Sequence, residues 1–71
     1  MQIFVKYLTT HTFDVNNNTT GDELKNMVSE RINIPMEYFY IIYSSKIVSD
    51  KVLSDYNINE LSRLDVMLRH C

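Results

Sequence analysis

The chain has 71 residues, but only one glycine, one proline and one cysteine. The single cysteine, Cys71, excludes a disulfide within the chain and fits a reducing compartment. Glycine and proline are the usual turn residues, so a chain with so few of them needs other residues in its turns. Asparagine and serine fill this role, and the polar segments 16–19 and 44–45 are predicted to be turns.

Long apolar runs and an excess of basic residues are also missing. No run approaches membrane-spanning length, and the amino terminus lacks the basic-then-apolar layout of a signal peptide. The net charge of -2 argues against a surface dedicated to nucleic acid. We therefore expect one monomeric domain over residues 1–71, in the cytoplasm or the nucleus, with no membrane or nucleic-acid partner.

The stretch from Thr20 to Pro35 predicts one amphipathic helix. Thr20 and Glu23 have the spacing of a capping box, and Asn33 can take the left-handed conformation that ends a helix. The apolar residues recur at helical spacing and gather on one face: Leu24, Met27, Val28 and Ile32. A single helix of this kind needs a sheet against which to bury its apolar face.

Alternating and continuous apolar runs predict the strands of that sheet. The expected strands are residues 1–7, 11–15, 38–43, 46–48 and 61–68. A turn at Thr9–Thr10 joins the first two as a hairpin, and a packed loop with a short helical turn is expected at 53–58. The run 38–43 is almost wholly apolar, so we expect it to be well covered. The last strand should turn three side chains inward: Leu64, Val66 and Leu68.

This order of elements predicts an α+β fold with the β-grasp arrangement, a mixed sheet of four to five strands packed on one helix. The first hairpin is followed by a crossover helix, and later strands are added beside it. The last strand has to find room next to the first one. A parallel pairing there requires a long crossover connection, which the helix and the intervening strands supply.

Two blocks of the sequence resemble ubiquitin. The opening MQIFVK, with Leu8 and Thr9 after it, and the block LSDYNI at 53–58 are identical to ubiquitin segments in the same order. The resemblance spans nearly the whole chain and implies the β-grasp fold. The segment HTFDV at 11–15 makes the chain closest in character to the ubiquitin-like moieties that are fused to small-subunit ribosomal proteins.

The departures from ubiquitin bear on function. The chain has Arg69-His70-Cys71 where the terminal diglycine of ubiquitin would begin, so the chain as given is expected not to be conjugated. Leu68 and Arg69 match the tail that activating enzymes read. Gly21 replaces a large apolar residue, which should weaken the helix and the nearby core. Three lysines match chain-forming positions and are candidate linkage sites: Lys6, Lys25 and Lys46.

The resemblance also implies two interaction surfaces. Leu8, Ile42 and Met67 match the apolar recognition patch of ubiquitin, and an exposed apolar patch is normally an interaction site. Asp65 and Tyr40 stand where ubiquitin has histidine and arginine. The negative charge of Asp65 should weaken binding of ubiquitin-binding domains with acidic rims. A second, smaller surface matches Gln2, Phe4 and Thr12, although single exposed aromatic side chains are common.

No catalytic constellation is recognisable, and we expect neither a metal nor a cofactor. His70 and Cys71 supply two potential ligands on a terminal segment, whereas a metal needs three or four, so a frayed terminus is the simpler interpretation. The aromatic residues of 38–43 lack neighbouring basic side chains that could hold phosphates. Core packing is therefore favoured over base stacking for them.

Three hypotheses for function remain. The leading one is a divergent ubiquitin-like domain, not an enzyme, that forms the amino-terminal moiety of a ribosomal protein fusion. There it would aid folding and solubility of the ribosomal protein carboxyl-terminal to it. The second is a ubiquitin-type modifier whose diglycine tail is not in this sequence. The third is a domain of a larger protein that recruits partners through Leu8, Ile42 and Met67.

A thioester assay with ubiquitin-activating enzyme separates the modifier hypothesis from the other two. The 71-residue chain should form no thioester, because activation needs a small, unhindered carboxyl-terminal pair. The informative sample is a form extended by Gly-Gly, with ubiquitin as the positive control. A thioester on the extended form would support the modifier, and its absence would end that hypothesis.

Overall fold

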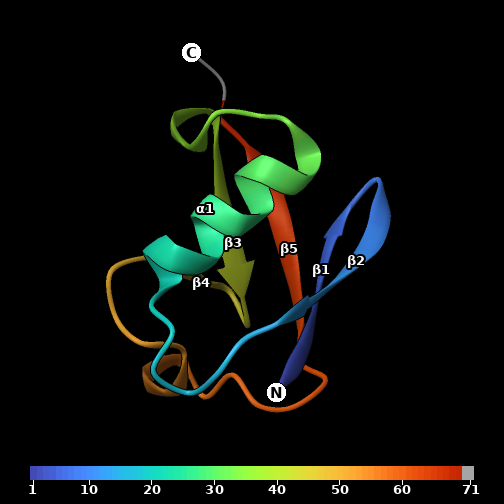
Figure 1. Ribbon diagram of the computed structural model, residues 1–71. Coiled ribbons are helices and arrows are strands. Elements are labelled where there is room, and N and C mark those ends of the chain that lie inside the picture. The colour runs from blue at the N-terminus through green and yellow to red at the C-terminus, as the bar shows by residue number, and fades with distance from the viewer. Residues whose placement is uncertain (70–71) are drawn as a thin grey trace.

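The computed structural model describes residues 1–69. They fold into a five-stranded sheet with one helix on one face (Figure 1). The strands are β1 (Gln2–Tyr7), β2 (Thr9–Asp14), β3 (Phe39–Tyr43), β4 (Lys46–Val48) and β5 (Arg63–Leu68). The helix is α1 (Gly21–Ile32), and there are two short 3-10 helices, η1 (Met36–Tyr38) and η2 (Leu53–Tyr56). The strands lie in the order β2-β1-β5-β3-β4, with β1 and β5 parallel. This confirms the α+β, β-grasp prediction.

The ends of α1 form as the sequence predicted. The amide of Glu23 donates to the Thr20 hydroxyl at 3.2 Å, and the amide of Thr20 donates to a Glu23 carboxylate oxygen at 3.2 Å. The two bonds complete a capping box. At the other end, Asn33 has a left-handed backbone with φ of 60°, and its amide donates to the Ser29 carbonyl at 2.9 Å.

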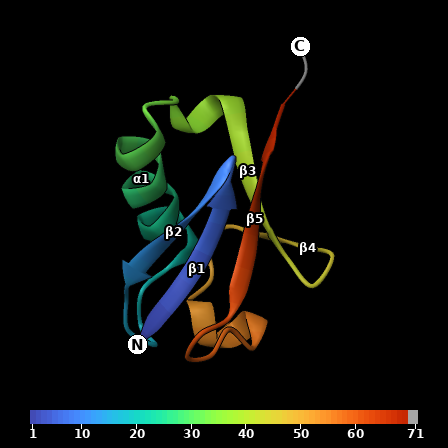
Figure 2. The ribbon, with the colours of Figure 1, turned by 90° about the vertical axis from the view of Figure 1, so that its right-hand side faces the viewer.

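The core lies between α1 and the sheet face that it covers. Leu24 and Val28 of the helix are fully buried there. The sheet and the loops contribute the other buried side chains: Ile3, Val5, Phe13, Val15, Phe39, Ile41, Val48, Leu53, Ile58 and Leu64. Figure 2 shows α1 on one side of the sheet, while no other element packs on the opposite side. The molecule therefore has one buried and one open sheet face.

The first hairpin is tighter than predicted. Tyr7 pairs with Thr9, so β2 begins at Thr9 rather than at His11, and the predicted turn at Thr9–Thr10 is wrong. The chain reverses at Leu8, whose φ of 63° is left-handed. A left-handed residue reverses the chain within fewer residues than a two-residue turn requires.

The strand at 38–43 is shorter and less covered than predicted. Tyr38 belongs to η1 and is 50% exposed, so the strand begins at Phe39. Only Phe39 and Ile41 of β3 are buried, and the side chains that alternate with them, Tyr40 and Ile42, point to the open face. The apolar run suggested a strand that is well covered, but one helix can cover only one face of the sheet.

The last strand also differs from the prediction at both ends. It begins at Arg63, because Leu61 has a left-handed φ of 66° and lies in the preceding turn. Leu64 is buried and Val66 is half-buried, as predicted, but Leu68 is 45% exposed. Leu68 pairs with Phe39, the first residue of β3, at the end of the sheet where few side chains can cover it.

Gly21 does not weaken the core as the sequence suggested. It is buried, and its amide donates to the Lys51 carbonyl at 2.9 Å. A Cβ at this position would lie well inside the contact distance of the Ser49 carbonyl oxygen and 2.8 Å from a methyl carbon of Val48. The backbone of the β4–η2 loop therefore occupies the space that a side chain would need.

We predict that Gly21→Ala destabilises the fold by about 1–3 kcal/mol, the usual cost of overpacking. In an open helical position the same change would stabilise by up to about 1 kcal/mol. Urea unfolding of the variant measures the difference. The exposed helix position Asn26 is the matched control, because Asn26→Ala should leave stability unchanged or raise it slightly. A stabilised Gly21→Ala variant would show that the loop has room to move.

Candidate functional site

The open face of the sheet carries the side chains that the sequence predicted for partner binding. In the pairing of β3 with β5, Tyr40 lies opposite Met67 and Ile42 lies opposite Asp65. Side chains of one strand alternate between the two faces, and the neighbouring residues Phe39 and Ile41 are buried against α1. The structure therefore brings these four residues together on the open face.

Leu8 joins this group from the tip of the first hairpin. Its side chain is 87% exposed, and it lines a shallow hollow together with Ile42 and Met67. The three residues come from β3, β5 and the β1–β2 turn, which are distant in sequence. Their predicted association is thus present in the fold, although their use by a partner is not tested by it.

Ile47 is a residue of this surface that the sequence analysis missed. It pairs directly with Ile42 across the β3–β4 hairpin and is 57% exposed. The two-residue turn at 44–45 fixes this register, so the alternation of the strand could have placed Ile47 on the open face. We name Leu8, Ile42, Ile47 and Met67 the apolar patch.

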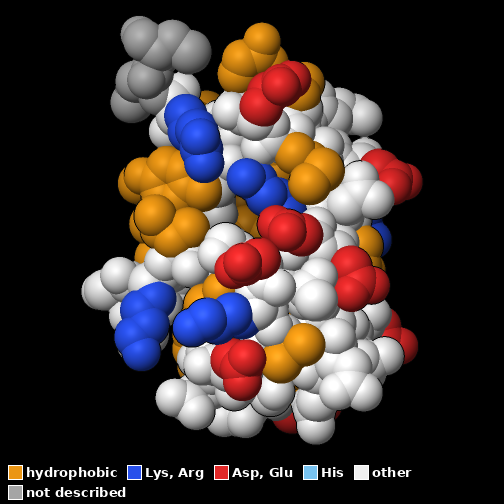
Figure 3. All heavy atoms as spheres, turned by 90° about the vertical axis from the view of Figure 1, so that its left-hand side faces the viewer, with side chains coloured by type: hydrophobic (Ala, Val, Ile, Leu, Met, Phe, Trp, Pro, Cys, Tyr) orange, Lys and Arg blue, Asp and Glu red, His pale blue; other side chains and the backbone are white. Residues whose placement is uncertain are grey.

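Charged groups border the apolar patch on both sides. Asp65 is exposed beside Ile42, and on its other side β5 pairs with β1, where Asp65 lies opposite Lys6. At the carboxyl-terminal end, the Arg69 guanidinium lies 5.8 Å from the centre of the Tyr40 ring. Figure 3 shows this end, where hydrophobic side chains gather next to basic ones.

The second predicted surface lies on the same open face, on β1 and β2. Phe4 pairs with Thr12 on one side and with Arg63 of β5 on the other, and Gln2 lies two residues before Phe4. Phe4 is half-buried. A hollow beside it is lined by Lys6, Thr10, Arg63, Leu64 and Asp65 as well. The two predicted surfaces are thus halves of one sheet face, with Arg63 and Asp65 between them.

The candidate linkage lysines differ in their surroundings. Lys6 and Lys46 are exposed, whereas Lys25 is half-buried with its ammonium 5.6 Å from the centre of the Phe39 ring. Burial lowers the pKa of Lys25, and the positive charge of Arg69 lowers it further, against an opposing effect of Asp22. Lys25 is therefore the least accessible of the three amines.

The predicted tail residues Leu68 and Arg69 continue the line of β5. The Arg69 amide donates to the Tyr38 carbonyl at 2.8 Å, which holds the end of this segment against η1. Leu68 and Arg69 line a hollow with Tyr40 and Ile47. His70 and Cys71 lie outside the described residues.

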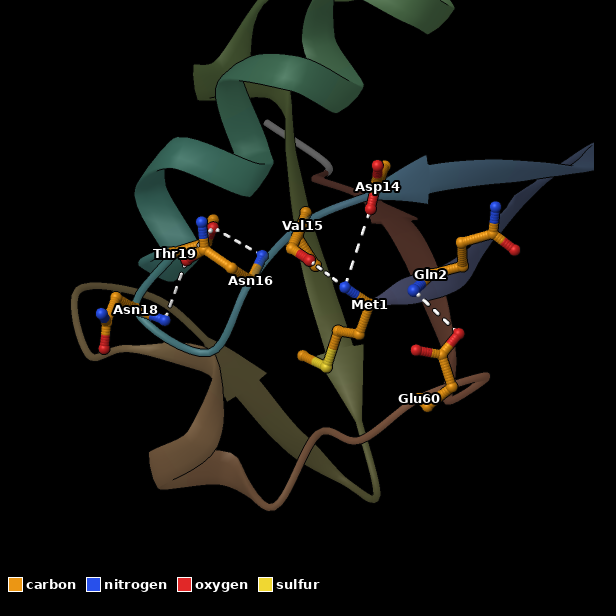
Figure 4. A network of polar contacts seen from close by, with 8 residues as sticks. All are labelled: Met1, Gln2, Asp14, Val15, Asn16, Asn18, Thr19 and Glu60. Atoms are coloured by element: carbon orange, nitrogen blue, oxygen red, sulfur yellow. Dashed lines mark hydrogen bonds and ion pairs between the residues drawn. The ribbon is translucent and has the colours of Figure 1, made fainter.

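A separate polar cluster surrounds the amino terminus (Figure 4). The Met1 ammonium donates to the Val15 carbonyl and lies 3.7 Å from a carboxylate oxygen of Asp14. Beside it, the amide of Gln2 donates to the Glu60 carboxylate at 3.0 Å. These groups satisfy one another and join the start of β1 to two loops. The bonds within this cluster are explained by the fold.

Residues 1–69 contain no group of three His, Cys, Asp or Glu residues that could hold a metal ion. None of their helices is long and apolar enough to cross a membrane. The absence of a catalytic site and of a cofactor stays a prediction.

Comparison with known proteins identifies the family. The model of the ubiquitin family matches residues 3–71, which is nearly the whole chain. The chain belongs to the ubiquitin family. It is also 38% identical over 60 residues to the UV excision repair protein RAD23 homolog of Dictyostelium discoideum. That alignment covers 83% of this chain but only 18% of the relative, so the chain spans about a fifth of the length of the protein it matches.

Membership of the ubiquitin family gives the open sheet face its context. Ubiquitin-like domains are generally protein-interaction modules rather than enzymes, and a patch of exposed apolar side chains suits that role. The relative is named as a repair protein, not as a ribosomal one. The predicted ribosomal fusion therefore stays a prediction.

We predict that Leu8→Asn preserves or slightly raises stability, by up to about 1 kcal/mol, because asparagine tolerates a left-handed backbone better than leucine. The Leu8 side chain is 87% exposed, so its removal leaves no cavity. Thermal unfolding measures this effect. Ile41→Asn serves as the contrasting variant, since Ile41 is fully buried and its loss should unfold the domain. A marked loss of stability in Leu8→Asn would mean that Leu8 packs against the fold.

Proposed function

We propose that this ubiquitin-family domain recruits a partner protein through the apolar patch, as one domain of a longer protein. The relative supports the second half of this proposal, because a segment similar to this chain makes up 18% of its length. The patch supports the first half. Its residues come from four places in the sequence, yet the fold gathers them on one uncovered face.

Leu8 is the observation on which the proposal rests. A left-handed backbone is unfavourable for leucine by roughly 1–2 kcal/mol, and an 87% exposed side chain recovers almost none of this through burial. Asparagine or glycine would suit the same turn better. A residue that opposes the local preference and gains nothing from the core is best explained by a contact outside the domain.

The shape and charge of the surface define the kind of partner. The hollow between Leu8, Ile42 and Met67 is shallow, which suits the apolar side of a helix rather than an inserted loop. Asp65 lies next to Ile42 and has no ion-pair partner among residues 1–69. A partner with a basic or neutral residue opposite Asp65 is favoured, and one with an acidic rim is disfavoured.

The two other hypotheses keep their own tests. The ribosomal fusion requires a basic ribosomal protein after Cys71 in the reading frame, and the intact mass of the protein from cells would show it. A modifier requires a Gly-Gly end in that frame and the thioester described above. No observation on residues 1–69 favours either hypothesis over partner recruitment. A location in the cytoplasm or the nucleus is part of all three.

A titration with a ubiquitin-associated domain that has an acidic rim tests the proposal. We expect amide shifts at Leu8, Ile42, Ile47 and Met67 in NMR spectra, with weak affinity. Asp65→Asn should tighten binding by about three- to fivefold, because it removes a like charge from the contact. Leu8→Asn should weaken it by about tenfold.

Asp55→Asn is the matched control for charge. Asp55 is exposed on η2, outside the apolar patch, and the change alters the net charge of the domain equally. It should leave the affinity unchanged. If shifts occurred elsewhere on the domain, or if both asparagine variants tightened binding equally, recruitment through the apolar patch would be refuted.

A further inference from the structure

The outer edge of β2 has backbone groups that no strand satisfies. Met1 and Val15 exchange two backbone hydrogen bonds across the hairpin. In an antiparallel pair, residues that exchange both bonds alternate with residues that exchange none. From Val15 backwards, Phe13, His11 and Thr9 therefore bond to β1. The backbone N–H and C=O groups of the alternate residues point away from β1: Asp14, Thr12 and Thr10.

Nothing in the described chain covers this edge. β2 is the last strand of the sheet, and no backbone hydrogen bond from other parts of residues 1–69 reaches Thr10, Thr12 or Asp14. Figures 1 and 2 show β2 at the outside of the molecule, with its free edge open to solvent. Three donors and three acceptors thus stand in a row.

The β2 edge lacks the features that normally block strand addition. Edge strands are usually protected by lysine, proline, a bulge or short length. β2 has neither lysine nor proline, and its six residues pair with β1 in one unbroken register. The opposite edge, β4, is only three residues long and begins with Lys46. Of the two edges, β2 is the one that can accept a further strand.

A hollow lies next to this edge, between β2 and α1. Phe13, Met27, Glu30 and Arg31 line it. Phe13 is almost fully buried, and the Arg31 guanidinium lies 4.9 Å from the centre of its ring. Among residues 1–69 the one ion pair joins the amino terminus to Asp14, so Arg31 has no carboxylate partner there. The hollow therefore offers apolar walls and two opposite charges, Glu30 and Arg31, which form no ion pair with each other.

We infer that the β2 edge binds an extended peptide segment of a partner protein as a sixth strand of the sheet. The peptide main chain bonds to Thr10, Thr12 and Asp14. Because successive side chains of a strand alternate, every second one points toward α1 and reaches the hollow. An aliphatic side chain suits Phe13 and Met27 there, and an acidic side chain that lies above the Phe13 ring meets the Arg31 guanidinium.

A second copy of the chain fits this edge less well. The β2 strand of a second copy would present His11 and Phe13 toward the hollow. Its Phe13 is already buried in its own core, with only 4% of its surface exposed. It therefore has no apolar side chain left to fill the space. Two copies would also meet through only six residues each, much less than the roughly 20 residues a side of a stable interface.

Selection from a phage library of random peptides of about ten residues tests the inference, because a strand of that length spans the edge. We expect enriched sequences in which aliphatic residues alternate and an acidic residue lies beside one of them. A synthetic peptide of this sequence should slow hydrogen exchange at the amides of Thr10, Thr12 and Asp14. Without peptide these amides should exchange fast, whereas those of His11 and Phe13 should be protected.

Thr12→Pro is the decisive variant. The Thr12 amide points away from β1, so proline removes one bond to the peptide while the β1–β2 ladder keeps its bonds. Affinity for the peptide should fall by at least about tenfold. Thr12→Val is the matched control, since it changes the side chain but keeps the amide, and it should bind within about twofold. Arg31→Glu, at an exposed position on α1, tests the charge without altering the strand and should weaken binding to the acidic peptide by about tenfold.

Several results would overturn the inference. They are a library without enriched sequences, a peptide that protects amides of β3 or β4 instead, and unchanged affinity in both Thr12→Pro and Arg31→Glu. Concentration-dependent dimers that protect Thr10 and Thr12 without peptide would assign the edge to a second copy. None of these results concerns the apolar patch, so the two proposals stand or fall separately.

Discussion

One helix of twelve residues can cover only one face of a five-stranded sheet, and the rest of the structure depends on this limit. The side chains that alternate toward α1 form the only core among residues 1–69, with Leu24 and Val28 at its centre. Those that alternate away have no internal partner. Each strand therefore contributes one set of residues to stability and another to the surface, and the register decides which residue belongs to which set.

The scarcity of glycine shapes the turns. Among residues 1–69, six non-glycine residues have a left-handed backbone: Leu8, Asn33, Ser44, Ser45, Asn57 and Leu61. Asparagine and serine tolerate this conformation through their short polar side chains, but leucine has no such advantage. The one glycine is placed where space rather than conformation requires it, because the Ser49 carbonyl approaches Gly21 closely. The close approach of the Ser49 backbone thus determines the residue at position 21, and the left-handed conformation favours asparagine or serine at most of the turn positions.

Local signals predicted the elements well. The capping box of α1, its end at Asn33 and the Ser44–Ser45 turn are each specified by neighbouring residues, so the sequence was sufficient for them. The turn at Leu8 failed for a local reason, because leucine gives no signal for a left-handed backbone. Two other predictions that failed depend on distant parts of the chain. By the alternation of β5, Leu68 is on the same side as Leu64 and Val66. It lies beyond the end of the core and is therefore exposed. Gly21 looked like a defect because the loop that fills its space is about thirty residues away in sequence.

The candidate surface shows the same division. The resemblance to ubiquitin indicated Leu8, Ile42 and Met67. The register of β3 with β5 places Ile42 and Met67 on one face, and Leu8 lines the same hollow from the β1–β2 turn. Ile47 was missed because a three-residue strand shows little alternation by itself. The free groups on β2 could not be predicted at all, since their direction depends on which residues of the hairpin exchange bonds. The two bonds between Met1 and Val15 fix which residues these are.

The two proposed binding regions lie on different parts of the sheet. Ile42, Ile47 and Met67 project from the open face of β3, β4 and β5, whereas Thr12 directs its backbone groups sideways from β2. A strand added to β2 would widen the sheet without covering those three side chains, since β1 lies between. The regions approach each other only at the hairpin tip, where Leu8 directly precedes the first residue of β2. Partners at both regions would therefore meet at Leu8, whose left-handed backbone is unfavourable for leucine.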